Sequence, residues 1–231
     1  KFSLIQMSLI DTWAATGAGA FSLSENSLYT IEGWQIFLNR LDSNGLFTVS
    51  RWYNPENLGE TGRLVSLAAA SLHEFGIQDV DKHIALLTIN NLATIIVCKN
   101  PFTSADIETI NAKASELQFN VILTPGTAVT NETLSKIITS KNNSSLKKII
   151  QSHPLKIDPP TDDNPYFFNM LRLSNISLAD SNLQRGVMMG NLRATKMLLL
   201  LILFLLIMAV AAVLVPLFLK TKEKTDFFRR A

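Results

Sequence analysis

"KFSLIQMSLID", residues 1–11, decides how this 231-residue chain is interpreted, because it is a nearly continuous apolar run that ends in one acid. Such runs are typical of parallel strands that are covered on both faces. A chain that opens inside such a strand, at Lys1 and with no leader before it, is expected to be the C-terminal part of a longer polypeptide. Asp11, directly after the strand, is the first candidate functional residue.

Helices and strands alternate after this first strand. Helical spacing, β-forming runs and turn residues predict further elements. They are a helix over 24–41 capped by Ser24 and stopped by "SNG" at 43–45, a strand over 45–52, a helix over 63–76, two strands joined by Asn90-Asn91, a helix capped by Thr103 or Ser104, a short strand at 120–126 and polar surface helices within 127–157. Alternation predicts a parallel α/β sheet, to which the later hairpin adds an antiparallel edge.

One segment indicates a membrane. Residues 197–219, "MLLLLILFLLIMAVAAVLVPLFL", contain no charged or strongly polar side chain. As a helix they would be ~34 Å long at 1.5 Å per residue, enough for a hydrocarbon core of about 30 Å. Pro216 is tolerated in a membrane helix. We therefore predict one C-terminal transmembrane helix.

The composition argues against several kinds of site. The formal net charge is only +2, and no basic stripe with interleaved aromatics precedes residue 180, so no nucleic acid partner is predicted. Cys98 is the sole cysteine and lies in an apolar run, which favours a buried thiol in a reducing compartment. The three histidines have no ligand spacing, so no metal site is predicted. "TGAGA" at 16–20 lacks the order of a glycine-rich phosphate loop.

Two charged residues follow the first two predicted strands. Ligands of open parallel sheets bind beyond the carboxyl ends of the strands, and Asp11 and Arg51 fall at that edge. Two plainer interpretations remain open. Asp11 is a turn or helix cap in one of them, and Arg51 is a solvated charge or a partner of Asp11 in the other.

Most of the chain before the apolar segment resembles a known family, and the first fifty residues do so most specifically. "FSLIQMSLIDTWAATGAGAFSLSENSLYTIEGWQIFLNRLDSNGLFTVSRW", followed by "PPTDDNPYFF" and a membrane span, resembles the bacterial membrane-associated spermidine-synthase-like proteins. These are similar to class I S-adenosylmethionine-dependent transferases with added transmembrane helices. The resemblance implies a partial Rossmann-like methyltransferase sheet, from the fourth of seven strands onward.

The resemblance also implies a cofactor. It would be S-adenosylmethionine or its decarboxylated form, held by a glycine-rich loop and a ribose-binding acid in the missing N-terminal half. The acceptor would be a small cationic amine. A fragment that lacks those strands is not expected to bind the cofactor alone.

The resemblance assigns three site residues. Soluble spermidine synthases end the fourth strand with Asp-Ser-Thr-Asp-Pro, whose first Asp is the base on the attacking amine. Aligned without gaps, Ser8 stands at that base and Asp11 at the second, substrate-binding Asp, while Tyr29 matches the Tyr of the following helix. A serine hydroxyl does not take a proton from an amine near neutral pH unaided. A one-residue slip or a bulge would restore Asp11 as the catalytic base.

"IDPPTDDNPYFF" at 157–168 allows two interpretations. In the first, Asp162 and Asp163 close over the active-site edge and hold a cationic substrate. In the second, which we favour, the prolines brace a linker while Tyr166 and the two phenylalanines dock on the domain or the membrane interface.

The predicted organisation has four parts. Residues 1–125 are the C-terminal half of the transferase domain, 126–195 polar helices and a proline-rich linker, 196–220 the transmembrane helix and 221–231 a basic tail. The functional hypothesis is aminopropyl or methyl transfer to an amine; the alternative is a non-catalytic nucleotide-fold module tethered to a membrane protein.

Two cues to membrane orientation disagree. Adenosyl cofactors are cytosolic, which predicts that the globular part faces the cytoplasm from the bacterial inner membrane. The positive-inside rule favours a cytoplasmic tail instead, because five Lys and Arg residues follow the span closely, whereas only Arg185, Arg193 and Lys196 closely precede it. We give the cofactor more weight, since further spans set orientation too.

Overall fold

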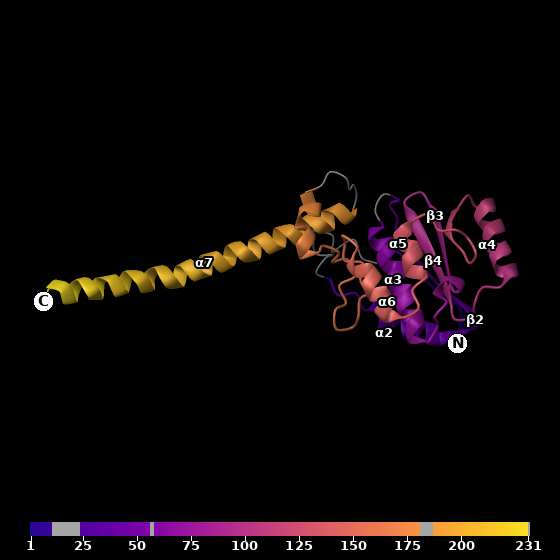
Figure 1. Ribbon diagram of the computed structural model, residues 1–231, viewed down its shortest axis with the longest axis horizontal. Helices are drawn as coiled ribbons and strands as arrows, with labels where there is room; N and C mark the ends of the chain where they lie inside the picture. The colour runs from indigo at the N-terminus through magenta and orange to yellow at the C-terminus, as the bar shows by residue number, and fades with distance from the viewer. Residues whose placement is uncertain (11–23, 56–57, 181–186, 231) are drawn as a thin grey trace.

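The computed structural model describes residues 1–10, 24–55, 58–180 and 187–230. Helices and strands alternate along most of the chain (Figure 1). In order they are β1 (Phe2–Ser8), η2 (Ser27–Tyr29), α2 (Ile31–Arg40), β2 (Leu41–Trp52), α3 (Gly59–Glu74), η3 (Val80–Lys82), β3 (Ile84–Ile89), β4 (Leu92–Cys98), α4 (Ser104–Glu116), β5 (Asn120–Leu123), α5 (Glu132–Ile138), α6 (Asn143–Gln151), η4 (Leu173–Asp180) and α7 (Val187–Arg230).

The strands form one open mixed sheet. Its order is β1-β2-β4-β3-β5, with β1 parallel to β2 and the β3–β4 hairpin antiparallel within itself. Asn90 turns this hairpin with a positive φ of 50°, as the Asn90-Asn91 pair predicts. We expected the hairpin to form the edge of the sheet, and this was wrong, because β5 pairs with the outer side of β3. The mixed α/β class is confirmed.

β1 differs from its predicted environment. It is parallel to β2, as predicted, but in the described part of the chain it pairs on one side only and forms the edge. Met7 is buried against the core, whereas Phe2 and Leu4 are 57% and 51% exposed. Among the described residues, β1 is therefore covered on one face only, contrary to the prediction, and its outer edge has no strand partner.

Local backbone chemistry moves two helix boundaries. The first helix begins at Ile31 and not near Ser24, because residues 27–29 form a separate 3₁₀ turn and Thr30 accepts the cap bond from the Gly33 amide. It ends at Arg40, before "SNG", where the buried Leu41 is already extended. Gly45 then approaches the Phe2 carbonyl so closely that a Cβ would lie 2.8 Å from its oxygen, at the register shift between β1 and β2.

The helices cover the two faces of the sheet unequally. α2, α3, α5 and α6 lie on one face and α4 lies alone on the other (Figure 1). α3 is buried on all sides from Gly59 to Leu72 because it packs against β2, β4, α2, α5 and α6. It begins four residues earlier than predicted, and Gly76 ends the turn after it with a φ of +77°. α3 is the central helix of the core.

The chain after the sheet belongs to the same core. α5 and α6 pack on α3 and bury Leu134, Ile137 and Leu146. The segment that follows contributes Ile157, Phe167 and other side chains to the same hydrophobic cluster. Residues 155–171 are thus part of the globular fold.

Arg63 attaches this segment to α3. It is 1% exposed, and its Nε donates to the Asp158 carbonyl at 2.8 Å. Its NH1 donates to the carbonyls of Tyr166, Phe167 and Asn169 at 2.7–3.0 Å. Burial lowers the pKa of Arg63 to about 10, so the guanidinium stays charged near neutral pH. A buried cation thus satisfies four carbonyls of a proline-rich stretch that has no regular backbone pairing of its own.

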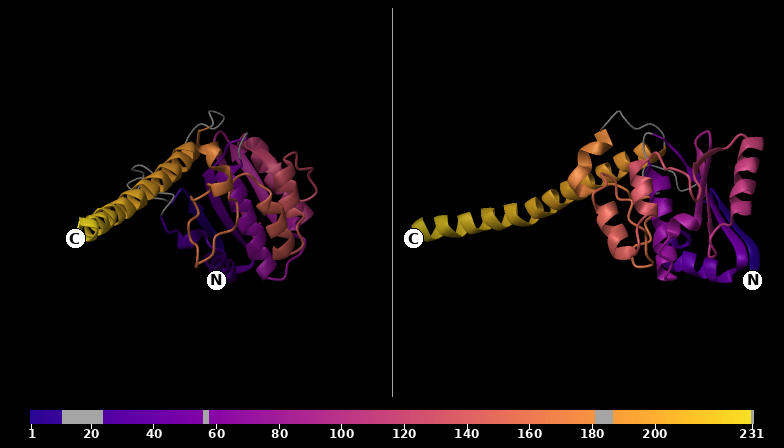
Figure 2. Two further views of the ribbon diagram at one scale, coloured as in Figure 1. Left: turned by 60° about the vertical axis from the view of Figure 1, so that its left-hand side comes forward. Right: turned by 45° about the vertical axis from the view of Figure 1, so that its right-hand side comes forward.

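α7 leaves the globular part as one long helix, seen from two further sides in Figure 2. Its stretch Leu192–Phe218 is long and apolar enough to cross a membrane. This stretch includes nearly all of the predicted span. Pro216 lies inside the helix. The helix starts before the predicted boundary at 196, at Val187.

Replacing Arg63 should destabilise the whole domain. Arg63→Met leaves four carbonyls, that of the buried Phe167 among them, without their donor, and we expect a loss of about 3 kcal/mol in the free energy of unfolding. Urea denaturation in detergent micelles, followed by tryptophan fluorescence, measures this loss. Arg40→Met, at an exposed arginine of α2, is the matched control and should change stability little. Equal effects of both substitutions would contradict the role given to Arg63.

Candidate functional site

The carboxyl ends of β1 and β2 meet at one edge of the sheet. Ser8 is the last residue of β1 and pairs in register with Ser50, one residue before Arg51. The Ser8 side chain is exposed, whereas Arg51 is 2% exposed on the opposite face of β2. This edge is where ligands of open parallel sheets bind.

Arg51 is the centre of a buried polar and aromatic cluster. Its NH1 donates to the Tyr29 hydroxyl at 3.3 Å. Its guanidinium carbon lies 5.4 Å from the Tyr29 ring centroid, 5.8 Å from that of Phe167 and 4.8 Å from that of Phe168. Rings at such distances attract a cation through their quadrupoles. Three aromatic residues that are distant in sequence thus surround one side chain from β2.

Glu60, in the first turn of α3, balances the charge of Arg51. Its Oε2 accepts from Arg51 Nε at 3.0 Å and from NH2 at 2.8 Å, and both side chains are 3% exposed. Removing both charges from water costs several kcal/mol per ion, which paired geometry and hydrogen bonds offset. The plainer interpretation of Arg51 as a solvated charge is therefore wrong.

The structure describes two of the three predicted site residues. Ser8 lies at the end of β1, as expected. Tyr29 is fully buried, stacks on Phe167 with ring centroids 4.6 Å apart, and uses its hydroxyl to accept from Arg51. Asp11, the predicted substrate-binding acid and candidate base, lies outside the described residues.

The proline-rich segment closes over this cluster through its aromatic residues. Phe167 and Phe168 are 0% and 2% exposed, so they dock on the domain, as the favoured interpretation predicts. Asp162 accepts from the Thr30 hydroxyl at 2.7 Å, and its own amide donates to Glu32. Both aspartates are exposed, and Asp162 holds the start of α2 through these bonds.

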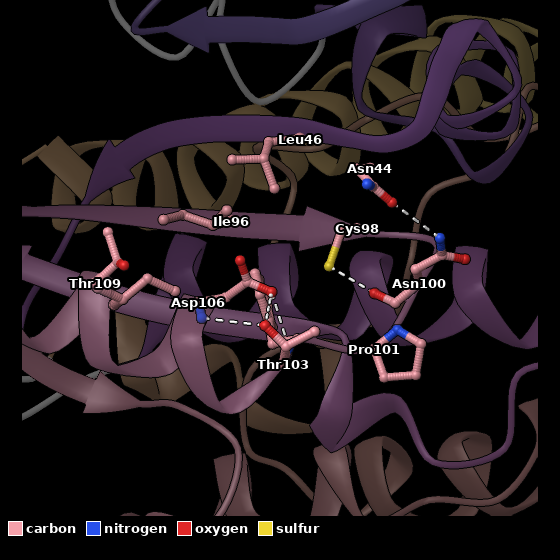
Figure 3. A pocket seen from close by; sticks show the side chains of 11 residues that line it. Asn44, Leu46, Ile96, Cys98, Asn100, Pro101, Thr103, Asp106 and Thr109 are labelled. Carbon is pink, nitrogen blue, oxygen red and sulfur yellow. Dashed lines mark hydrogen bonds between the residues drawn. The ribbon is translucent and has the colours of Figure 1, made fainter.

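A cavity of about 550 Å³ lies at the other end of the sheet, beneath α4 (Figure 3). Leu46 and Ile96 form its apolar floor, and Cys98 and Asp106 border it. Asp106 is engaged in the capping box of α4, where it accepts from the amide and hydroxyl of Thr103. Burial raises the pKa of Cys98 to about 12, and its thiol donates to the Asn100 carbonyl at 2.9 Å. Neither group is poised as a base or nucleophile.

The histidines have structural partners. His73 bonds the Ile77 carbonyl at 2.8 Å and the Ser140 hydroxyl at 3.0 Å, and His83 bonds the Cys98 carbonyl at 3.1 Å. Burial lowers the pKa of both, and of His153. Within the described ranges, no three His, Cys, Asp or Glu side chains gather closely enough to hold a metal ion.

Sequence reasoning missed Glu60 and Arg63. Glu60 was assigned to a loop and Arg63 to the start of a helix. The two residues stand three positions apart beside the uncharged stretch "LVSLAAAS". Charged residues at this spacing share one helix face. Their position next to a buried helix was the available signal of buried ionic roles.

Comparisons with protein-family models, with curated proteins and with solved structures find no match for this chain.

Removing the Glu60 carboxylate should destabilise the cluster. Glu60→Gln leaves the guanidinium of Arg51 buried without the carboxylate that accepts two of its bonds, at an expected cost of about 3 kcal/mol. Glu132→Gln, in the exposed pair with Lys136, is the control and should cost less than about 1 kcal/mol. Urea denaturation of the two variants side by side makes the comparison. A Glu60 variant as stable as the Glu132 variant would show that the pair is not desolvated.

Proposed function

We propose that this chain is the C-terminal part of a membrane-anchored, spermidine-synthase-like transferase. It would transfer an aminopropyl or methyl group from an adenosyl cofactor to a small cationic amine. The observation that supports this most directly is the strand arrangement: two parallel strands, β1 and β2, followed by an antiparallel hairpin. The family resemblance implies this arrangement from the fourth strand onward.

The free edge of β1 supports a larger sheet. Phe2 and Leu4 expose more than half of their surface beside an edge whose backbone has no strand partner among the described residues. Exposed apolar edges are templates for further strands. In the proposal, strands N-terminal to β1 cover this edge and carry the glycine-rich loop and the ribose-binding acid.

The substrate edge is the carboxyl end of β1. Ser8 is exposed there, and Asp11 follows it by three residues. In the proposal, Asp11 binds the cationic amine, and the Arg51–Glu60 pair contributes no net charge that would repel it. The buried ring of Tyr29 supports this edge from beneath through Arg51 and Phe167.

The membrane assignment is part of the proposal. Leu192–Phe218 is apolar and long enough to span a bilayer. An adenosyl cofactor would place the globular part on the cytoplasmic side of a bacterial inner membrane. α7 then anchors the transferase beside the bilayer.

One observation favours the alternative, a non-catalytic nucleotide-fold module. Tyr29, Arg51 and Glu60 fill the described part of the edge with side chains that bond one another. A G-x-G-x-x-G loop with an acid about twenty residues later in an N-terminal segment would favour the enzyme. Its absence there would favour the module.

Asp11→Asn in the full-length protein tests the substrate edge. Losing one charge-assisted bond costs about 1.5–3 kcal/mol, which weakens amine binding roughly ten- to a hundredfold. Amine titration calorimetry measures the change. Asp42→Asn, at an exposed acid at the start of β2, is the matched control and should leave binding unchanged.

A different result would contradict this assignment. If Asp11→Asn lowers only the unfolding temperature and leaves amine binding intact, Asp11 is a cap. Ser8→Asp provides a second test, because restoring an acid at the family's base position should raise aminopropyl transfer. No gain would count against the ungapped alignment.

The chain alone should not bind the cofactor. Residues 1–195 lack the loop and acid that the proposal assigns to other strands, so S-adenosylmethionine should produce no calorimetric heat. The free apolar edge of β1 should also make this protein poorly soluble. Adding the N-terminal half should restore solubility and binding. Micromolar binding of S-adenosylmethionine by residues 1–195 would contradict the proposal that part of the cofactor site lies in N-terminal strands.

A further inference from the structure

The exposure of α7 changes along its length. Leu192 is 1% exposed and belongs to the hydrophobic core of the globular part. Between 194 and 199 most side chains are half-buried. The side chains of residues 200–218 are exposed, apart from the half-buried Ala211. The globular part therefore covers α7 up to about residue 199.

The uncovered stretch matches the thickness of a bilayer. The 19 residues from 200 to 218 form ~28 Å of helix at 1.5 Å per residue, against a hydrocarbon core of about 30 Å. If α7 spans a membrane, the hydrocarbon begins near residue 200. An element that contacts α7 just before residue 200 then lies near the headgroups.

η4 contacts α7, and because residues 200–218 are almost all exposed, we infer that it does so on the turns before this stretch. Its first residue, Leu173, is 73% exposed, more than any other large hydrophobic side chain whose exposure the structure describes. The segment is held in place on both sides of Leu173. Arg172 pairs with Asp158 at 2.9 Å, and Asn175 donates to the Pro154 carbonyl at 2.9 Å. Leu173 is thus held outward on a fixed support.

Basic side chains lie at the same level of α7. Arg193 and Lys196 precede residue 200 by roughly 6–10 Å along the helix. Headgroup layers are about 5–8 Å deep on each side of the hydrocarbon. Lys196 therefore falls within the headgroup layer and Arg193 just beyond it, where cations are still attracted to anionic lipids. Basic side chains thus lie near the expected start of the hydrocarbon, on the helix that η4 contacts.

We propose that η4 is a membrane-interfacial element that inserts Leu173 at the boundary between headgroups and acyl chains. The occupant of this surface is lipid. The proposal rests on α7 spanning a bilayer and is independent of any catalytic activity. Inserting one leucine beside an existing span adds apolar burial and fixes how the globular part is tilted on the membrane.

Depth-dependent quenching tests this in the full chain. Cys98→Ala removes the native thiol, and Leu173→Cys then carries an environment-sensitive fluorophore. The protein is placed in vesicles of phosphatidylcholine and phosphatidylglycerol that contain lipids brominated near the headgroup or near the chain end. We expect a blue-shifted emission and stronger quenching by the shallow bromines.

Two controls separate the outcomes. Leu117→Cys labels another exposed leucine, 56% exposed, at the end of α4 on the side away from α7 (Figure 1), and it should not be quenched. Leu206→Cys labels the uncovered stretch and should be quenched by the deep bromines if α7 spans the bilayer.

Three results would overturn the proposal. Emission and quenching at 173 equal to those at 117 would place Leu173 in water. A blue shift at 173 without lipid quenching would show that protein covers it. Absence of quenching at 206 would remove the spanning helix on which the proposal rests.

Discussion

The guanidinium of Arg63 is the interaction on which the rest of the structure depends. It projects from α3, a helix with no exposed side, and donates to four carbonyls between Asp158 and Asn169. Those carbonyls belong to a stretch that forms neither helix nor regular sheet. Arginine suits this role because its fixed fork offers several donors and keeps its charge when buried.

This attachment explains the position of the aromatic residues at the sheet edge. Holding the carbonyls of Tyr166 and Phe167 places Phe167 and Phe168 over Arg51 and Tyr29. Two buried arginines thus organise this region. Arg51 of β2 bonds the Glu60 carboxylate, and Arg63 of α3 bonds backbone carbonyls. The edge that the proposed transferase would use is supported from beneath by this arrangement.

The same attachment links the sheet to α7, the helix that is apolar enough to cross a membrane. After Asn169, Met170 and Leu171 remain in the core, η4 packs on α7, and Leu192 is buried again. If α7 spans a membrane, a domain that packs on it through η4 is more restricted in orientation than one on a glycine-rich or serine-rich linker. For an enzyme at a membrane, this would determine which side of the sheet edge faces the bilayer.

Short-range signals predicted most of the described elements. The alternation of strands and helices, the Asn90-Asn91 turn, the Thr103 cap and the apolar C-terminal helix depend on neighbouring residues, and each was found. The start of α2 was misplaced because Ser24 and Thr30 are both good caps, and only tertiary contact of Thr30 with Asp162 favours one of them.

Long-range pairing was beyond such reasoning. Glu60 lies nine residues from Arg51, and Arg63 about a hundred from its carbonyls, so no periodicity reveals them. The exposure of β1 was missed for a related reason, because an apolar run indicates what a strand tolerates and does not indicate which partners are present.

Hydrogen–deuterium exchange of residues 155–171 tests the central claim most directly. If Arg63 makes this segment part of the core, amides such as that of Lys156, which donates to the Met170 carbonyl, should exchange only when α3 does. A segment that exchanges like a surface loop while α3 remains protected would contradict the account.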